Sequence, residues 1–184
     1  GFRQRFEEAD IFIPEQAGWT QKSIQEIMDI SNGKKEPEEL LRDSFMPSSF
    51  QKEILKIIYR SKKPITFIDV REDNPLWQEH KSFGIEMPLL SAEMQGNFDV
   101  ALELIKTKII RDASFHKARE DLMISQLGTK IEQVIKEHSY LAQKKELKVL
   151  LFLGAFHSRI HSLLTEQGLK INTNFIQQEE KSFG

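Results

Sequence analysis

The chain has 184 residues, a length that fits one domain or at most two small ones. Hydrophobic residues make up 39% and charged residues 29%, which excludes collagen-like, mucin-like and fully disordered chains. The formal charge of −2 gives no electrostatic argument for a nucleic acid or an anionic membrane as partner. The chain contains no cysteine, which excludes disulfides and thiolate metal sites.

The sequence carries no sign of membrane insertion or targeting. Its longest apolar run, 149–156, is far shorter than the roughly 20 residues of a membrane span, so no span is expected. The chain begins at Gly1 rather than at Met, which indicates a processed, trimmed or incomplete start. The charged first residues are not a signal peptide, although a signal peptide removed earlier would leave no trace. A cytoplasmic location is compatible with these features.

Apolar patterns along the chain predict alternating strands and helices. Short continuous apolar runs are typical of buried strands, and apolar residues at every third or fourth position are typical of helices. Thr20 is the expected N-cap of the first helix. In chain order we expect a strand at 10–15, a helix at 23–30, a charged surface connection at 34–39, a helix from 47 that ends before Pro64, a strand at 65–70, an irregular stretch at 73–94, a long helix at about 97–142 that is either single or bent near Gly128, a strand at 147–153, a helix at 158–167 and an edge strand at 169–175.

This order predicts a single α/β domain over residues 1–176, followed by a frayed tail at 177–184. We expect a small, mostly parallel sheet of three to four strands, with helices outnumbering strands. The carboxyl ends of parallel strands meet at one edge of the sheet, where ligands bind in such folds. Glu15, the Asp69–Arg71 segment and residues 154–157 are therefore expected to meet.

Gly154 and His157 directly follow the last of the buried strands. A glycine there permits a tight turn or a close approach of the backbone, and a histidine can bind a metal or act as a general acid or base. His157 and His161 have the spacing of a helical histidine pair, but the glutamate of a His-Glu-x-x-His zinc motif is missing. The alternative is that they are an ordinary loop histidine and a surface histidine.

Charged residues elsewhere are further candidates. Glu15 either binds a metal or activates water, or is an ordinary capping or solvated carboxylate. Arg119 shares a helix face with Arg111 and either stabilises an oxyanion or belongs to a solvated face with ion pairs. Asp69 with Arg71 is either a further polar contribution to the sheet edge or a structural ion pair.

Three separated segments carry a family resemblance. They are Ala-Asp-Ile-Phe-Ile-Pro-Glu at 9–15, Arg-Glu-Asp-Leu-Met at 119–123, and the apolar strand with Gly-x-x-His at 150–157. In order and approximate spacing, from about residue 9 to 175, they resemble the TraB/PrgY superfamily. Its related branches include the Tiki proteins, the haem-binding ChaN lipoproteins and the erythromycin esterases. The chain departs from the family in having Glu120 for Asn or Asp, and in lacking before Phe2 the family's first strand with its own Gly-x-x-His, which implies an N-terminally incomplete domain.

The resemblance implies a metal-assisted hydrolase with Glu15, Arg119 and His157 as catalytic residues. Glu15 and His157 would bind Mn, Co or Zn or act as bases, and Arg119 would contact an oxyanion or a carboxylate. Gly154 and His161 would contribute to cofactor binding. The ChaN branch implies the alternative of a haem or small-ligand binding module without turnover, and a degenerate interaction scaffold is a further alternative. The expected ligand is a small molecule or a peptide, and the long helix offers a surface for a homodimer.

Overall fold

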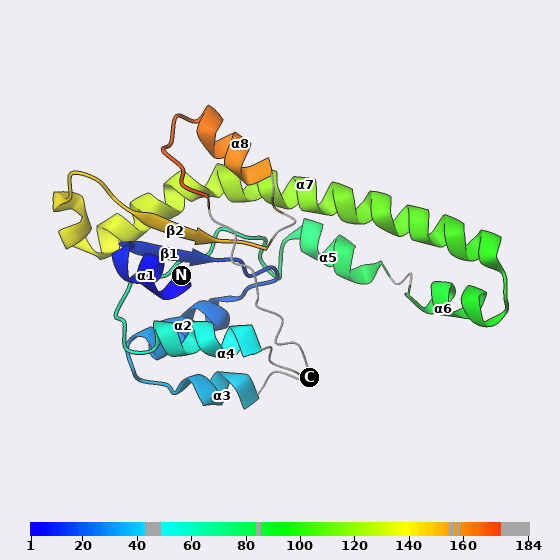
Figure 1. Cartoon of the computed structure of the whole chain (residues 1–184), viewed down its shortest axis with the longest axis horizontal. Coiled ribbons are helices and arrows are strands. Elements are labelled where there is room, and N and C mark those ends of the chain that lie inside the picture. Colours follow the sequence, from blue (N-terminus) through cyan, green and yellow to red (C-terminus); the bar gives the residue numbers. More distant parts are fainter. Residues whose placement is uncertain (43–48, 84–85, 155–156, 158, 174–184) are drawn as a thin grey trace.

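The computed structural model describes residues 1–42, 49–83, 86–154, 157 and 159–173. This part of the chain is mostly helical, with a small parallel sheet and one long helix (Figure 1). In chain order the elements are α1 (Phe2–Glu8), β1 (Ile11–Pro14), α2 (Gln21–Ser31), α3 (Pro37–Arg42), α4 (Ser49–Ile58), α5 (Pro75–Ser82), α6 (Glu86–Met94), α7 (Phe98–Glu137), the 3₁₀ helix η1 (Ser139–Gln143), β2 (Val149–Phe152) and α8 (Arg159–Glu166).

The sheet joins two segments from opposite ends of the chain. Strands β1 and β2 pair in parallel, with a register that runs from Ile11 opposite Val149 to Pro14 opposite Phe152. Both strands end at the same edge, so the residues that follow them, Glu15 in one case and the segment to His157 in the other, start from neighbouring positions. The parallel sheet is as expected, but it has two strands among the described residues rather than three to four.

The segment 65–70, expected as a strand, lies on the other side of β1 without forming a full ladder. It makes one isolated parallel bridge, between Phe12 and Ile65, with hydrogen bonds from Phe12 N to the Pro64 carbonyl and from Thr66 N to the Phe12 carbonyl. Every residue of the segment is buried. Its apolar character therefore reflects burial between layers, and it still brings Asp69 towards the edge at which β1 ends.

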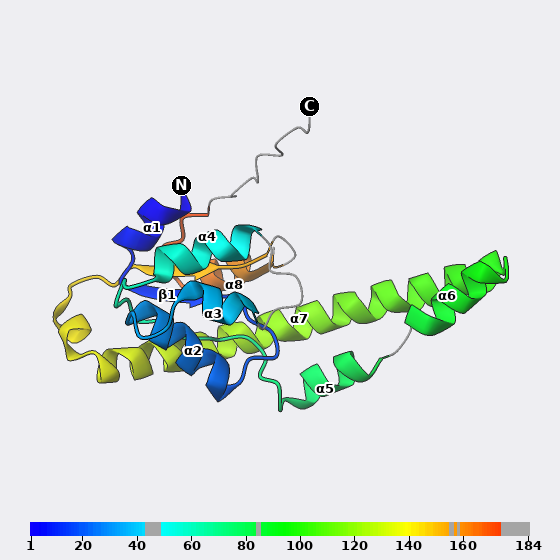
Figure 2. The ribbon, with the colours of Figure 1, turned by 90° about the horizontal axis from the view of Figure 1, so that it is seen from below.

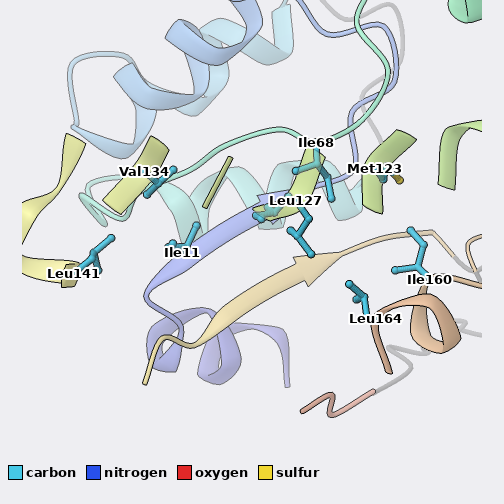
Figure 3. Close-up of a cluster of buried hydrophobic side chains, with 9 residues drawn as sticks. Ile11, Ile68, Met123, Leu127, Val134, Leu141, Ile160 and Leu164 are labelled. Atoms are coloured by element: carbon cyan, nitrogen blue, oxygen red, sulfur yellow. The ribbon is translucent and has the colours of Figure 1, made fainter. Parts of the chain in front are cut away.

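Alternation along β1 divides the core between the two faces of the sheet. Ile11 and Ile13 join one cluster, and α7 and α8 cover that face (Figure 3). Phe12 faces the other cluster, which α1, α2 and α4 cover. The first cluster contains the buried residues Ile11, Ile13, Ile68, Met123, Leu127, Val134, Leu141, Ile160 and Leu164, and the second contains Phe6, Phe12, Ile30, Leu55, Ile58 and Ile65. The sheet is thus enclosed between two helical layers.

Helix α7 dominates the shape of the molecule. It runs for 40 residues through Gly128 as one continuous helix, which of the two alternatives expected for this stretch is the single helix. Its C-terminal half lies along the sheet, whereas its N-terminal half extends away from it beside α6 (Figure 2). It ends at Glu137, and η1 occupies the last residues of the expected range.

Three expectations about local structure differ from the structure. The stretch 73–94, expected to be irregular, contains α5 and α6, and α3 begins inside the expected connection 34–39. No strand is found at 169–173, the described part of the expected edge strand. The expected tail 177–184 lies outside the described residues. No described helix is long and apolar enough to cross a membrane.

Candidate functional site at the carboxyl edge of the sheet

Glu15 is the centre of a polar cluster at the edge where β1 and β2 end. Its Oε1 atom lies 3.0 Å from Arg119 Nη2 and 2.9 Å from His157 Nε2. Its Oε2 atom accepts a hydrogen bond of 2.5 Å from the backbone N–H of Gly154. One carboxylate at the end of β1 thus contacts α7, 104 residues later in the sequence, and His157 after β2, 142 residues later.

These contacts stabilise the ionised form of Glu15. Partial burial by itself would raise the pKa of this carboxyl group, but the hydrogen bonds from His157, Gly154 and Arg119 outweigh burial. The pKa is lowered from 4.5 to about 2. Because the carboxylate then carries no proton at neutral pH, it can only accept hydrogen bonds, so Nε2 of His157 must be the donor.

Asp69 holds the other side of the Arg119 guanidinium. Nε of Arg119 donates to Asp69 Oδ1 at 2.9 Å and Nη2 donates to Oδ2 at 2.5 Å, so the pair is bidentate. Asp69 is fully buried and Arg119 is 4% exposed. Burial would lower the pKa of Arg119, but the contacts with Asp69 and Glu15 raise it overall. The guanidinium therefore stays charged and fixes the carboxylate of Glu15 in position.

His157 lies between two carboxylates. On its Nδ1 side, Oε1 of Glu120 is 3.7 Å away, too far for a hydrogen bond. Both atoms are buried, and neither has a hydrogen-bond partner among the described residues. The other oxygen of Glu120 accepts a hydrogen bond of 3.2 Å from Arg159, which also contacts Asp121. Two buried polar atoms thus face each other with no hydrogen bond between them, which is costly unless a further group completes the site.

The structure brings together most of the residues expected at this edge. Glu15, Arg119, His157 and the backbone of Gly154 form one network. His161 does not join it: the residue is exposed on α8, and no described contact links its side chain to the network.

The structure decides between the alternatives that the sequence left open for Arg119 and Asp69. Arg119 is enclosed rather than part of a solvated face, whereas Arg111 pairs with Glu79 near the surface. Asp69 pairs with Arg119 and not with Arg71, which forms an exposed ion pair with Asp73.

Glu120 belongs to the cluster, although the sequence analysis assigned it no role in the site. It lies in phase with Met123, Leu127 and Val134, which are buried on the core face of α7. The apolar period of α7 assigns position 120 to the core, where burying a charged side chain costs free energy. The sequence alone therefore marks Glu120 as unusual.

The donor set does not fit a metal ion held jointly by Glu15 and His157. The facing atoms of these two residues are hydrogen-bonded to each other, and the buried guanidinium of Arg119 donates to the same oxygen. A divalent cation there would lie beside a fixed positive charge. Among the described residues there is no group of three or more His, Asp or Glu side chains able to hold a metal. A haem iron would likewise compete with Glu15 for Nε2 of His157.

Comparisons with known proteins add no relative: no family model, curated protein or solved structure matches the chain. The geometry of the cluster is therefore the basis for a functional proposal.

Proposed function

We propose that the chain is a hydrolase that activates water with His157, oriented by Glu15. The observation that carries this proposal is the sharing of Glu15 Oε1 between Arg119 and His157 in a cluster at the carboxyl edge of a parallel sheet. A carboxylate–histidine pair fixed by a third group is the arrangement that general base catalysis requires.

The hydrogen bond to Glu15 sets the tautomer of His157. Because Nε2 donates its proton to the carboxylate, a neutral ring has its lone pair on Nδ1. In the proposed step, Nδ1 takes a proton from the attacking water while the water oxygen bonds to the carbonyl carbon of an ester or peptide. The proton then passes from Nδ1 to the leaving oxygen or nitrogen, which restores the neutral ring.

Glu120 would bind the same water. A water that donates to both Nδ1 and Glu120 Oε1 through hydrogen bonds of about 2.8 Å needs these acceptors roughly 4.5 Å apart. Their separation of 3.7 Å is slightly smaller. The proposal therefore requires a small widening of this contact when substrate and water bind.

Arg119 would act through Glu15 rather than on the substrate. Its guanidinium is enclosed and donates to Asp69 and Glu15, so its role is to hold the carboxylate that orients His157. Of the two roles that the resemblance implies for Arg119, the geometry favours the carboxylate partner over the oxyanion contact.

The test is a panel of chromogenic ester, amide and short peptide substrates, assayed with wild type, His157→Ala and Glu15→Gln. The proposal expects a loss of turnover of about 10²-fold or more in both variants, the usual contribution of a general base. His138→Ala is the matched control, because this histidine is the C-cap of α7, about 27 Å along the helix from Glu120, and the variant should retain full turnover. Turnover that survives His157→Ala, or no turnover on any substrate, would reject the proposal.

The same assay tests the metal assistance that the resemblance implies. Each reaction is run with EDTA and with added Mn²⁺, Co²⁺ or Zn²⁺. Stimulation by a metal in wild type and its loss in His157→Ala would support a metal-assisted hydrolase. If turnover is absent throughout, a haem titration distinguishes the remaining candidates: a Soret shift that His157→Ala abolishes identifies a haem-binding module, and no shift leaves an interaction scaffold.

A further inference from the structure

The N-terminal part of α7 carries an apolar stripe that nothing in the described chain covers. Its members are Phe98, Leu102, Ile105 and Ile109, and each is exposed, Phe98 by 77% and Ile109 by 62%. Large apolar side chains exposed singly are ordinary, but four that line one helix face form a contiguous patch, which marks an interaction surface.

The stripe lies on a part of the molecule that projects into solvent. Figures 1 and 2 both show this end of α7 extending beyond the sheet, with α6 as its neighbour. Buried Ala101 lies about 70° round α7 from the centre of the stripe, and half-buried Leu104 lies about 130° from it. The four members of the stripe are exposed with α6 in place, so a second helix can reach them.

The spacing of the stripe is that of a coiled-coil seam. Successive members are four, three and four residues apart, which corresponds to alternating a and d positions of a heptad. A seam of this kind buries its side chains against another helix with the same spacing. The chain itself offers such a helix in a second copy of α7.

Flanking charges select the orientation of the two helices. Asp99 and Lys106 occupy successive e positions beside the stripe. In an antiparallel pair e positions face e positions, so when Leu102 lies opposite Ile105 of the second copy, Asp99 of each copy faces Lys106 of the other. Lys106 contacts Glu103 within the chain, but both side chains are more than half exposed and the contact is easily exchanged. In a parallel pair Asp99 and Lys106 have no opposite charge across the seam.

We propose that two copies of this chain associate through the stripe as an antiparallel helix pair, with reciprocal Asp99–Lys106 contacts. The two α/β bodies then lie at opposite ends of the seam. The seam covers only about three helical turns, or roughly 17 Å, which is short for a stable dimer. The association is therefore expected to be weak and concentration-dependent.

Sedimentation velocity over a series of protein concentrations tests the association. Wild type should shift from monomer to dimer as concentration rises, and Ile109→Glu should weaken this association at least tenfold. Ile110→Glu is the matched control, since Ile110 is 67% exposed but points away from the stripe. A wild-type chain that stays monomeric at every concentration, or equal effects of Ile109→Glu and Ile110→Glu, would overturn the proposal.

A charge exchange tests the pairing. Asp99→Lys alone and Lys106→Asp alone place like charges across the seam and should each weaken association. The double variant Asp99→Lys/Lys106→Asp should restore it, because both contacts re-form with reversed sign. Failure of the double variant to recover association would reject the reciprocal contacts.

A distance measurement tests the orientation. The absence of native cysteines allows a single spin label at Ser114→Cys, an exposed position beyond the stripe. In the antiparallel pair the two labels lie about 30 Å apart along the axis, whereas in a parallel pair they lie within about 20 Å. The shorter distance would overturn the antiparallel arrangement even if a dimer forms. None of these outcomes depends on the hydrolase proposal, because no member of the stripe belongs to the cluster around Glu15.

Discussion

Asp69 and Arg119 form a buried bidentate ion pair between the segment beside β1 and the middle of α7. Loss of one partner leaves the other charge in a site shielded from water, so we expect Asp69→Asn to lower the free energy of unfolding by about 3 kcal/mol. Urea denaturation followed by circular dichroism measures this loss.

The exposed ion pair between Arg71 and Asp73 is the control for this prediction. Asp73→Asn should cost less than about 1 kcal/mol, as is usual for pairs in contact with water. A cost at Asp69 as small as at Asp73 would contradict the importance assigned to the buried pair.

Glu15 should make stability depend on pH below 5. Its folded-state pKa of about 2 is below the ordinary value of 4.5, so the unfolded chain binds the proton first as pH falls. The stability that Glu15 contributes is fully present above pH 4.5 and is lost as pH falls towards 2. Between pH 5.5 and pH 3.5 we expect wild type to lose about 1 kcal/mol more free energy of unfolding than Glu15→Gln.

Urea titrations at these two pH values measure the difference. Glu132→Gln, at an exposed position of α7, controls for the removal of one negative charge. Equal pH dependence of wild type and Glu15→Gln would show that the hydrogen bonds to Glu15 do not stabilise its ionised form.

Gly154 is closely approached by the carboxylate that its N–H binds. A Cβ atom at this position would lie 3.0 Å from Glu15 Oε2, tighter than ordinary van der Waals contact. Gly154→Ala should therefore push the Glu15 carboxylate away from its hydrogen bond and lower turnover by about tenfold. This factor corresponds to roughly 1.4 kcal/mol of activation free energy. Because the end of a glutamate side chain is flexible, the loss of stability should be small. Unchanged turnover in this variant would mean that the position of Glu15 does not matter.

At Gly128, substitution by alanine should stabilise the protein. It lies inside α7, and a Cβ atom there meets no other atom within 4 Å. Gly128→Ala should raise the free energy of unfolding by about 1 kcal/mol, because alanine restricts the unfolded chain and favours the helix. A thermal unfolding scan measures this, and a lower melting temperature would contradict the uninterrupted helix at this residue.

Glu120→Gln tests the role of Nδ1 of His157 as the acceptor of the water proton. The new amide can donate to Nδ1 and occupy its lone pair, so turnover should fall by about 10²-fold with little loss of stability. Kinetics and urea denaturation on the same variant measure the two effects. Unchanged turnover, or a large loss of stability, would contradict this role of Nδ1.

Much of the site could be expected from strand ends alone. Glu15 and Gly154 follow apolar runs, and parallel strands place such residues at one edge. The partner of Asp69 could not be identified in this way, because the nearby Arg71 and the distant Arg119 are equally plausible by charge. Only the packing of α7 along the sheet decides between them.

Prolines explain the helices that were not expected at 73–94. In the sequence alone, Pro75 and Pro88 suggest irregular backbone. In the structure Pro75 lies in the first turn of α5, after the N-cap Asn74, and Pro88 lies in the first turn of α6. A proline lacks only an N–H that would have no partner in a first turn, so it favours helix starts.

The apolar runs also predicted more strands than the sheet has among the described residues. The segment 65–70 is buried throughout, but only Ile65 forms a bridge with β1. Near the C-terminus, Ile171 packs beside the first hydrophobic cluster without strand pairing. Burial and strand pairing select similar residues, so composition cannot separate them.

The register between β1 and β2 has a consequence for how the molecule acquires its structure. Pairing Ile11 with Val149 closes a loop that contains most of the chain. The loss of chain entropy is offset only by contacts that form late in folding. The backbone hydrogen bonds of helix α7 join residues only four apart, so the helix can form beforehand, as a rod that shortens the distance to be closed. On a ribosome, Glu15 is synthesised 142 residues before His157, so the polar cluster can assemble only after His157 has left the exit tunnel.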